Sequence, residues 1–191
     1  AIVDEQHRFG VRQRVALSDK GNADLMVMSA TPIPRSLALT IYGDLNTTLI
    51  TDLPAGRKQV DTRLIHPSRR DDVFRFLVQR VKEGEQGFIV FPLVEESEKL
   101  EAKAAIQEME LLSKNQLAEV RVGLVHGQMG KEKDRIMEDF YRGEIDVLLA
   151  TTVVEVGMDV PNATVMIIEN ADRFGLAQLH QLRGRVGRSD K

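Results

Sequence analysis

Two arginines near the end of the chain stand at a spacing that suits phosphate binding. Arg185 and Arg188 lie three residues apart, and each directly follows a glycine. Behind the helix predicted at 175–182, two guanidinium groups at this spacing would leave one helical face together. A guanidinium group stays charged and pairs two oxygens at once, and glycine lets a phosphate come close. The pattern predicts a clamp on a polyanion, with a solvated or salt-bridged surface as the alternative.

Two acids near the beginning of the chain suit magnesium and water. Asp4 and Glu5 directly follow a short apolar run at 1–3, which predicts a buried strand that delivers acids to a crevice. One carboxylate can hold the shell of a metal ion, and its neighbour can orient or deprotonate an attacking water. The alternative is an exposed acidic turn. The arginines at the other end of the chain favour the catalytic interpretation.

Composition indicates an ordinary globular protein. The chain has 191 residues, with 26 Lys and Arg against 29 Asp and Glu, so its net charge is -3. Nucleic acid would therefore have to be held by local patches. With no cysteine, disulfides and thiolate metal sites are excluded. No apolar run approaches the length of a membrane span and no leader is present, so we expect a cytoplasmic protein with no membrane partner.

The predicted elements alternate in a way that is typical of an α/β fold. Short apolar runs predict strands at 1–3, 25–28, 62–65, 87–91, 120–125, 146–150 and 164–168. Helical periodicity and capping residues predict helices at 9–18, 36–42, 68–83, 97–112, 131–142 and 175–182, the first long one capped by Ser68 and the fifth ended by Gly143. We expect a parallel sheet flanked by helices.

The chain divides into two predicted domains. Residues 1–51 contain two strands, too few for a stable parallel sheet, so they are expected to be the tail of an incomplete first domain. Residues 52–58 are a turn-rich linker, and 59–191 form the second domain. Because the chain opens in mid-strand without methionine, we expect a piece of a longer protein. Unpaired strand edges predict either dimers of this piece or a mobile amino-terminal arm.

Four phrases occur in an order that resembles the superfamily 2 helicases. They are Val-Asp-Glu-Gln-His at 3–7, Ser-Ala-Thr-Pro at 29–32, the run from Thr151 to Pro161, and the run from Gln181 to Arg188. The resemblance implies a motor of two RecA-like domains with ATP in the cleft between them. This chain would supply the end of the first domain and the carboxyl-terminal helicase domain.

Finer phrases at 5–11, 32–39, 42–45, 53–58 and 126–129 are similar to the RecG family of ATP-dependent DNA helicases. That resemblance implies remodelling of branched DNA, such as stalled forks and Holliday junctions, in recombination and repair. Transcription-repair coupling translocases of the Mfd type share several phrases, but usually have Glu where Gln6 stands and lack Tyr-Gly-Asp-Leu at 42–45. A non-catalytic module that keeps the RecA shape is a third interpretation.

The resemblance implies a role for each matching residue. Asp4 would hold Mg²⁺ through water, Glu5 would be the general base, and Arg185 and Arg188 would be arginine fingers. Nucleotide contacts would come from Gln6, His7, Gly157, Asp159 and Gln181. Hydrolysis would be coupled to motion by Ser29 and Thr31, and the DNA contacts would be Thr151, Thr152 and Gly127. Leu182 replaces an arginine that is usual in the superfamily, so no role is carried over to it.

The phosphate loop of such motors is missing from these residues. No Gly-x-x-x-x-Gly-Lys-Ser/Thr phrase occurs in the sequence. We therefore expect the 191 residues alone neither to hydrolyse ATP nor to unwind DNA. The resemblance also implies that the full-length protein is a monomer of the bacterial cytosol, associated with the nucleoid.

Overall fold

The fold is described from a computed structural model, which describes residues 2–3, 26–28, 46, 48, 50, 59–92, 98–127, 129–151 and 160–187. Contacts divide the chain into two units, Ala1–Thr51 and Asp52–Lys191. In the first unit, β1 (Ile2–Val3) pairs in parallel with β2 (Met26–Val27), and the Met28 N–H donates to the Val3 carbonyl at 2.8 Å. The strands predicted there are confirmed, and the helices predicted at 9–18 and 36–42 lie outside the described residues.

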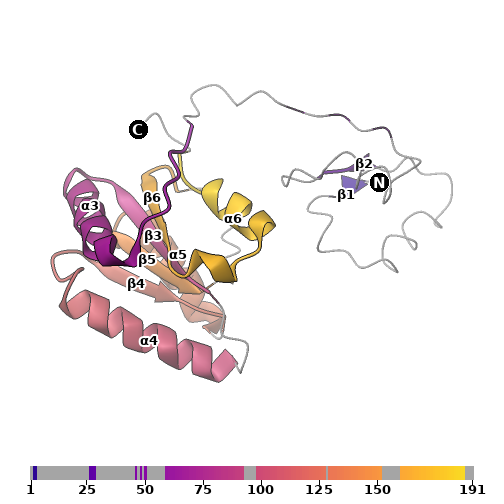
Figure 1. The fold of residues 1–191 in the computed structure, drawn as a ribbon. Helices are drawn as coiled ribbons and strands as arrows, with labels where there is room; N and C mark the ends of the chain where they lie inside the picture. Colours follow the sequence, from indigo (N-terminus) through magenta and orange to yellow (C-terminus); the bar gives the residue numbers. More distant parts are fainter. Residues whose placement is uncertain are drawn as a thin grey trace. The chain divides into compact units, whose positions relative to one another are not determined.

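The second unit is built on a parallel sheet of four strands in the order β4-β5-β3-β6 (Figure 1). The strands are β3 (Gln86–Phe91), β4 (Val122–Val125), β5 (Val147–Thr151) and β6 (Ala163–Ile168). The central strands β3 and β5 are buried along nearly their whole length, as their uninterrupted apolar sequences predict. The predicted parallel sheet is confirmed.

Helices cover both faces of this sheet (Figure 1). On one face, Phe74 and Leu77 of α3 (Arg70–Lys82) and Leu112 of α4 (Glu98–Lys114) pack on Ile89 and its neighbours. On the other face, α5 (Gly130–Tyr141) contributes Met137 and Phe140, and α6 (Leu176–Arg183) contributes partly buried leucines. The alternation of side chains along each strand supplies both faces, so the sheet is the centre of a three-layer fold.

The strand predicted at 62–65 is wrong. Residues 59–66 have no regular secondary structure, and the side chain of Leu64 is 95% exposed. A strand is stabilised by the ladder of hydrogen bonds to its neighbours, and this segment pairs with no strand in the described part of the chain. Residues that favour an extended chain do not by themselves create a strand.

Local capping residues set the start of the helix predicted at 68–83 and the end of α5. The predicted helix at 68–83 begins as the short 3₁₀ helix η2 (Pro67–Arg69), and α3 follows it. The cap is His66, whose Nδ1 accepts from the Ser68 N–H at 3.3 Å, so Ser68 is not the cap. At the end of α5, the predicted role of Gly143 is confirmed by its φ of 75°, a left-handed conformation that glycine adopts without strain.

Candidate functional site at the carboxyl edge of the sheet

The carboxyl ends of the four parallel strands meet at one edge, where open α/β sheets usually bind ligands. Thr151 ends β5, and Glu169 follows β6. In the ladder, Phe91 of β3 pairs with Thr151, while Val90 pairs with Ile168. The next pair in register places Glu169 beside Phe91. Thr151 and Glu169 therefore lie in one row on the face covered by α3 and α4.

Thr151 is buried at this edge. Its side chain is 3% exposed, and its hydroxyl has no hydrogen-bond partner in the described part of the chain. Burying a hydroxyl without a hydrogen-bond partner costs free energy, because the hydroxyl gives up its hydrogen bonds to water. The predicted DNA contact by Thr151 would require this hydroxyl to become accessible. Gly127, by contrast, is exposed in the turn after β4.

Arg70 holds two carboxylates at the same edge. Its Nε donates to Glu169 Oε1 and its terminal nitrogen donates to Glu108 Oε1, both at 2.8 Å. The guanidinium also lies 4.8 Å from the centre of the Phe74 ring, a favourable cation–π distance. Burial by itself lowers the pKa of Arg70, but the hydrogen bonds to both carboxylates outweigh it, so the pKa is raised. The group stays charged and joins α3, α4 and the end of β6.

The chain turns sharply after Glu169. The Glu169 N–H donates to the Val90 carbonyl at 2.9 Å, and Asn170 then adopts a left-handed conformation with φ of 48°. Asparagine tolerates this conformation better than most residues. A short 3₁₀ helix, η3 (Ala171–Arg173), follows, and Phe174 is buried in the core beside α5. This path leads directly into α6.

Arg185 does not lie on a helix. The helix α6 ends at Arg183, and the N–H of Arg185 donates to the Leu182 carbonyl at 2.9 Å in the turn that follows. Gly187 then has φ of 71°, a left-handed conformation, and Arg188 lies outside the described residues. The prediction that Arg185 leaves a helical face is therefore corrected, because the helix ends before it, at Gly184, while the placement of Arg188 stays a prediction.

Other side chains of α6 have local roles. Arg183 is exposed and lies 3.0 Å from His180 Nδ1. Since a guanidinium has only donors, the contact joins two side chains one turn apart on the same helix. Leu182, to which the resemblance assigned no role, packs against the core cluster of Phe140 and Val186. Gln181 is half-buried on the same helix.

The opposite, amino edge of the sheet is held by structural ion pairs. Arg121 pairs with Asp146, whose Oδ2 accepts from the Arg121 backbone N–H at 2.8 Å. Burial by itself raises the pKa of Asp146, but hydrogen bonds from the Arg121 side chain and backbone outweigh it, so the pKa is lowered. Arg80 pairs similarly with the buried Glu85. These contacts fix strand ends rather than build a reactive site.

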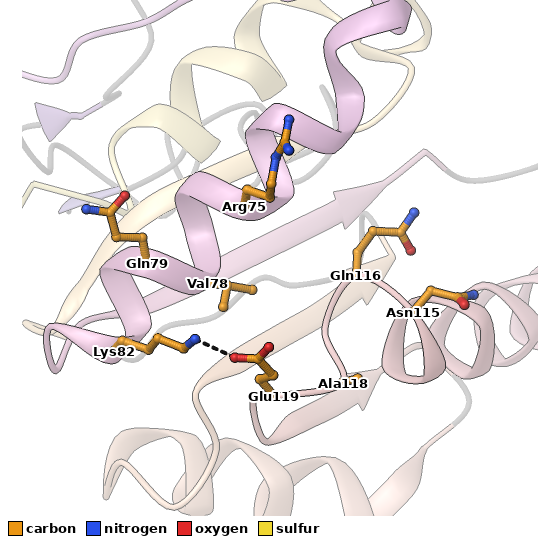
Figure 2. A pocket seen from close by; sticks show the side chains of 8 residues that line it. All are labelled: Arg75, Val78, Gln79, Lys82, Asn115, Gln116, Ala118 and Glu119. Atoms are coloured by element: carbon orange, nitrogen blue, oxygen red, sulfur yellow. Dashed lines mark hydrogen bonds and ion pairs between the residues drawn. The ribbon is translucent and has the colours of Figure 1, made fainter.

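A groove of about 390 Å³ lies between α3 and the turn that follows α4 (Figure 2). Its lining mixes charges, amides and small apolar groups: Arg75, Val78, Gln79, Lys82, Asn115, Gln116, Ala118 and Glu119. Lys82 and Glu119 form an ion pair across it (Figure 2). Because Lys82 ends α3 and Glu119 precedes β4, the groove does not coincide with the carboxyl edge.

The described residues include four of those predicted from the sequence: Gly127, Thr151, Gln181 and Arg185. The others lie outside the described residues: Asp4, Glu5, Gln6, His7, Ser29, Thr31, Thr152, Gly157, Asp159 and Arg188. Arg70 and Glu169 were missed, because no local spacing signals a contact across 99 positions. The part of the chain that the structure describes holds no group of three or more His, Asp or Glu that could bind a metal. It also holds no helix that is long and apolar enough to cross a membrane.

The chain matches one protein family and is similar to several known proteins. Residues 68–190 match the model of the helicase conserved C-terminal domain. ATP-dependent DNA helicase RecG of Thermotoga maritima is 58% identical over 98% of this chain and 24% of its own length. RecG of Aquifex aeolicus is 55% identical over 100% of this chain and 24% of its own length. The chain thus spans about a quarter of the length of these relatives.

Solved structures show the same fold. The TM-score is 0.63 to Saccharomyces cerevisiae Dbp5 bound to RNA and ADP BeF3, at 21% identity over 100% of this chain and 50% of that one. It is 0.62 to Mycobacterium smegmatis helicase Lhr bound to ssDNA and AMP-PNP, at 21% identity over 99% of this chain and 27% of that one. At such identities the likeness concerns the fold alone.

Proposed function

Because the chain belongs to the helicase conserved C-terminal domain family, we propose that it is part of the motor of an ATP-dependent DNA helicase. It supplies the second RecA-like domain and the end of the first. The observation that supports this most strongly is the 58% identity to a RecG helicase across nearly the whole chain. Such a motor is a cytosolic DNA translocase, and its preferred substrate is branched DNA such as a stalled fork or a Holliday junction.

The acids at 4–5 fit the magnesium ion that accompanies ATP in such motors. Mg²⁺ prefers oxygen ligands and keeps several waters, and Asp4 and Glu5 offer carboxylate oxygens side by side in the sequence. When bound, the ion neutralises charge on the phosphates. Asp4 would hold the water shell of the ion, while Glu5 would accept a proton from the water that attacks the γ-phosphate.

The arginines supply the second part of the chemistry. Phosphoryl transfer spreads charge over the γ-phosphate oxygens, so positioned cations lower the barrier without any covalent step. An arginine finger contributes about 10³ to 10⁵ in rate in related reactions. Glu5 belongs to the first unit and Arg185 to the second. Turnover in this proposal therefore depends on groups from both units, which links hydrolysis to their movement.

The remaining predicted residues bind DNA or nucleotide, or couple hydrolysis to motion. Thr152 and the exposed Gly127 contact the DNA backbone, and Thr151 joins them when its hydroxyl becomes accessible. Nucleotide is sensed by Gln6, His7, Gly157, Asp159 and Gln181, and its state is passed on by Ser29 and Thr31. With a net charge of -3, the chain holds DNA through such local contacts rather than through bulk charge.

The proposal is tested in a RecG-length protein that contains these 191 residues. We expect Arg185→Ala and Arg188→Ala each to lower DNA-stimulated ATP turnover by about 10³-fold or more, with little change in DNA affinity. The matched control is Arg142→Ala, which removes an exposed arginine that pairs with Glu138 at the far end of α5. Turnover that remains intact in both finger variants would show that the arginine assignment is wrong.

The substrate is tested separately with the unaltered protein. We expect a synthetic Holliday junction to stimulate ATP turnover more than a linear duplex of equal length does. RNA duplexes serve as the control for nucleic-acid type, because the likeness to RNA-bound Dbp5 concerns only the fold. Equal stimulation by linear and branched DNA would exclude the preference for branched DNA while leaving the motor proposal in place.

A further inference from the structure

The helix α6 carries Gln181 and leads to both arginines, yet none of its own residues is fully buried. Leu179 and Leu182 are only partly buried against the core. Fully buried side chains occur on either side of it instead, at Phe174 just before the helix and at Val186 just after it. The position of this segment therefore depends strongly on two apolar anchors at its ends.

Val186 is the anchor that lies between the arginines. Its side chain is 3% exposed and belongs to the core cluster that includes Phe88, Phe140 and Leu148. Adjacent side chains outside a helix point in different directions, so a buried Val186 directs the side chain of Arg185 away from the core. Arg185 is correspondingly only half-buried.

The backbone around Val186 is arranged to present it inward. Gly184 closes the helix through its N–H to the His180 carbonyl at 3.2 Å, and Arg185 continues the turn. Gly187 then adopts a left-handed conformation with φ of 71°. The backbone bonds of Gly184 and Arg185 return to α6 itself. Burial of Val186 in the same core cluster as Phe88 of β3 and Leu148 of β5 ties the turn to the sheet.

We propose that Val186 is a positioning residue for ATP turnover, because its packing in the core sets the direction in which the Arg185 side chain leaves the chain. This inference rests on the proposed function of the two arginines. A catalytic group that is displaced by about 1 Å can lose about 100-fold in rate. Removing the Val186 side chain should therefore lower the rate of ATP turnover by more than its effect on stability explains.

The test compares two valines of the same core cluster in a RecG-length protein that contains these residues. Val186→Ala removes the anchor, and Val90→Ala removes an equally buried valine of the central strand β3, which is 1% exposed. Both remove the same two methyl groups from the same core cluster, but only Val186 lies in the turn that carries Arg185. We expect Val186→Ala to lower kcat about 10- to 100-fold below that of Val90→Ala, with unchanged KM for ATP.

A third variant separates the effect of side-chain shape on kcat from the effect of stability on kcat. Val186→Thr keeps the shape of the side chain but buries a hydroxyl, so it lowers the Tm. We expect its kcat to exceed that of Val186→Ala even where its Tm is no higher. If kcat follows Tm across all three variants, Val186 is merely structural and the inference is overturned.

The outcome is distinguishable from a failure of the proposed function. If Arg185→Ala and Arg188→Ala leave turnover intact, the function of the arginines fails. If they abolish turnover while Val186→Ala and Val90→Ala behave alike at a temperature where both are folded, only the positioning role fails. Binding of a fluorescent non-hydrolysable ATP analogue, expected to be equal in both valine variants, confirms that the loss lies in turnover.

Discussion

Arg70 Nε donates to Glu169 Oε1 at 2.8 Å, joining the first residue of α3 to the residue that follows β6. A cation in the first turn of a helix is unfavourable, since the helix dipole is positive there. The two carboxylates of Glu108 and Glu169 offset this, and Glu169 is also held by its backbone bond to Val90. The bridge fixes the point at which the chain leaves the sheet towards α6.

Loss of this bridge should destabilise the fold. We expect Arg70→Ala to lower the free energy of unfolding by about 2 kcal/mol, because Glu108 and Glu169 would be left facing each other without a counter-charge. Arg63→Ala is the control, since it removes an arginine whose ion pair with Asp61 is almost fully solvated and whose loss should cost less than about 0.5 kcal/mol. Urea unfolding of the 191 residues, followed by circular dichroism, measures both. Equal effects would contradict a structural role for the bridge.

Acid should weaken the amino edge of the sheet through Asp146. Because the folded pKa of Asp146 is lowered, its contribution to stability is full above the unfolded pKa of about 3.9. The contribution is lost as the pH falls through the folded pKa. We expect Asp146→Asn to be less stable at pH 7 and to show a shallower loss of stability below about pH 4. Parallel curves for the two proteins, measured by thermal unfolding between pH 2 and 7, would exclude this role.

Close packing of α3 on β3 should make one glycine irreplaceable. A Cβ added at Gly87 would collide with Leu77 Cδ1 and lie 3.3 Å from the Val165 carbonyl oxygen. We expect Gly87→Ala to cost about 1–3 kcal/mol of stability through overpacking. Gly130→Ala is the matched control, since nothing lies within 4 Å of its added Cβ and the site is helical. Urea unfolding that shows Gly87→Ala to be as stable as the unchanged protein would contradict the packing described.

The hydroxyl of Thr151 should be dispensable for stability. Valine has nearly the same shape, and the hydroxyl that it removes is buried without a partner among the described residues. We therefore expect Thr151→Val to raise the free energy of unfolding by up to about 1 kcal/mol, or to leave it unchanged. A clear fall in Tm, measured by calorimetry, would mean that the hydroxyl is hydrogen-bonded in the folded protein.

Replacement of the two adjacent threonines should affect DNA binding to different extents. In a RecG-length protein we expect Thr152→Val to weaken DNA binding at low salt and to reduce the slope of log K against log salt by at most about one. Thr151→Val should have a smaller effect, because the burial of its hydroxyl limits its reach. Fluorescence anisotropy at several salt concentrations tests this. A larger loss for Thr151→Val would reverse the assignment.

The sequence predicted those parts of the fold that depend on local pattern. The apolar run at 87–91 and the one at 146–150 each match a strand to within one residue, because burial on both faces requires continuous apolar side chains. The segment at 62–65 was mispredicted as a strand, because a strand needs a neighbouring strand. Arg185 was mispredicted to leave a helical face, because the helix ends at Gly184. The contact of Arg70 with Glu169 depends on the folded topology, so no local pattern could reveal it.

The surface of α6 also offers a way to watch the arginine segment move. Leu176 is 86% exposed in the first turn of this helix, and the chain contains no cysteine. Leu176→Cys would therefore create a thiol that is unique within these 191 residues, to which a fluorescent dye could be attached without disturbing the core. Because Phe174 and Val186 clamp the helix at both ends, the dye would report rotation of the whole segment rather than local fraying.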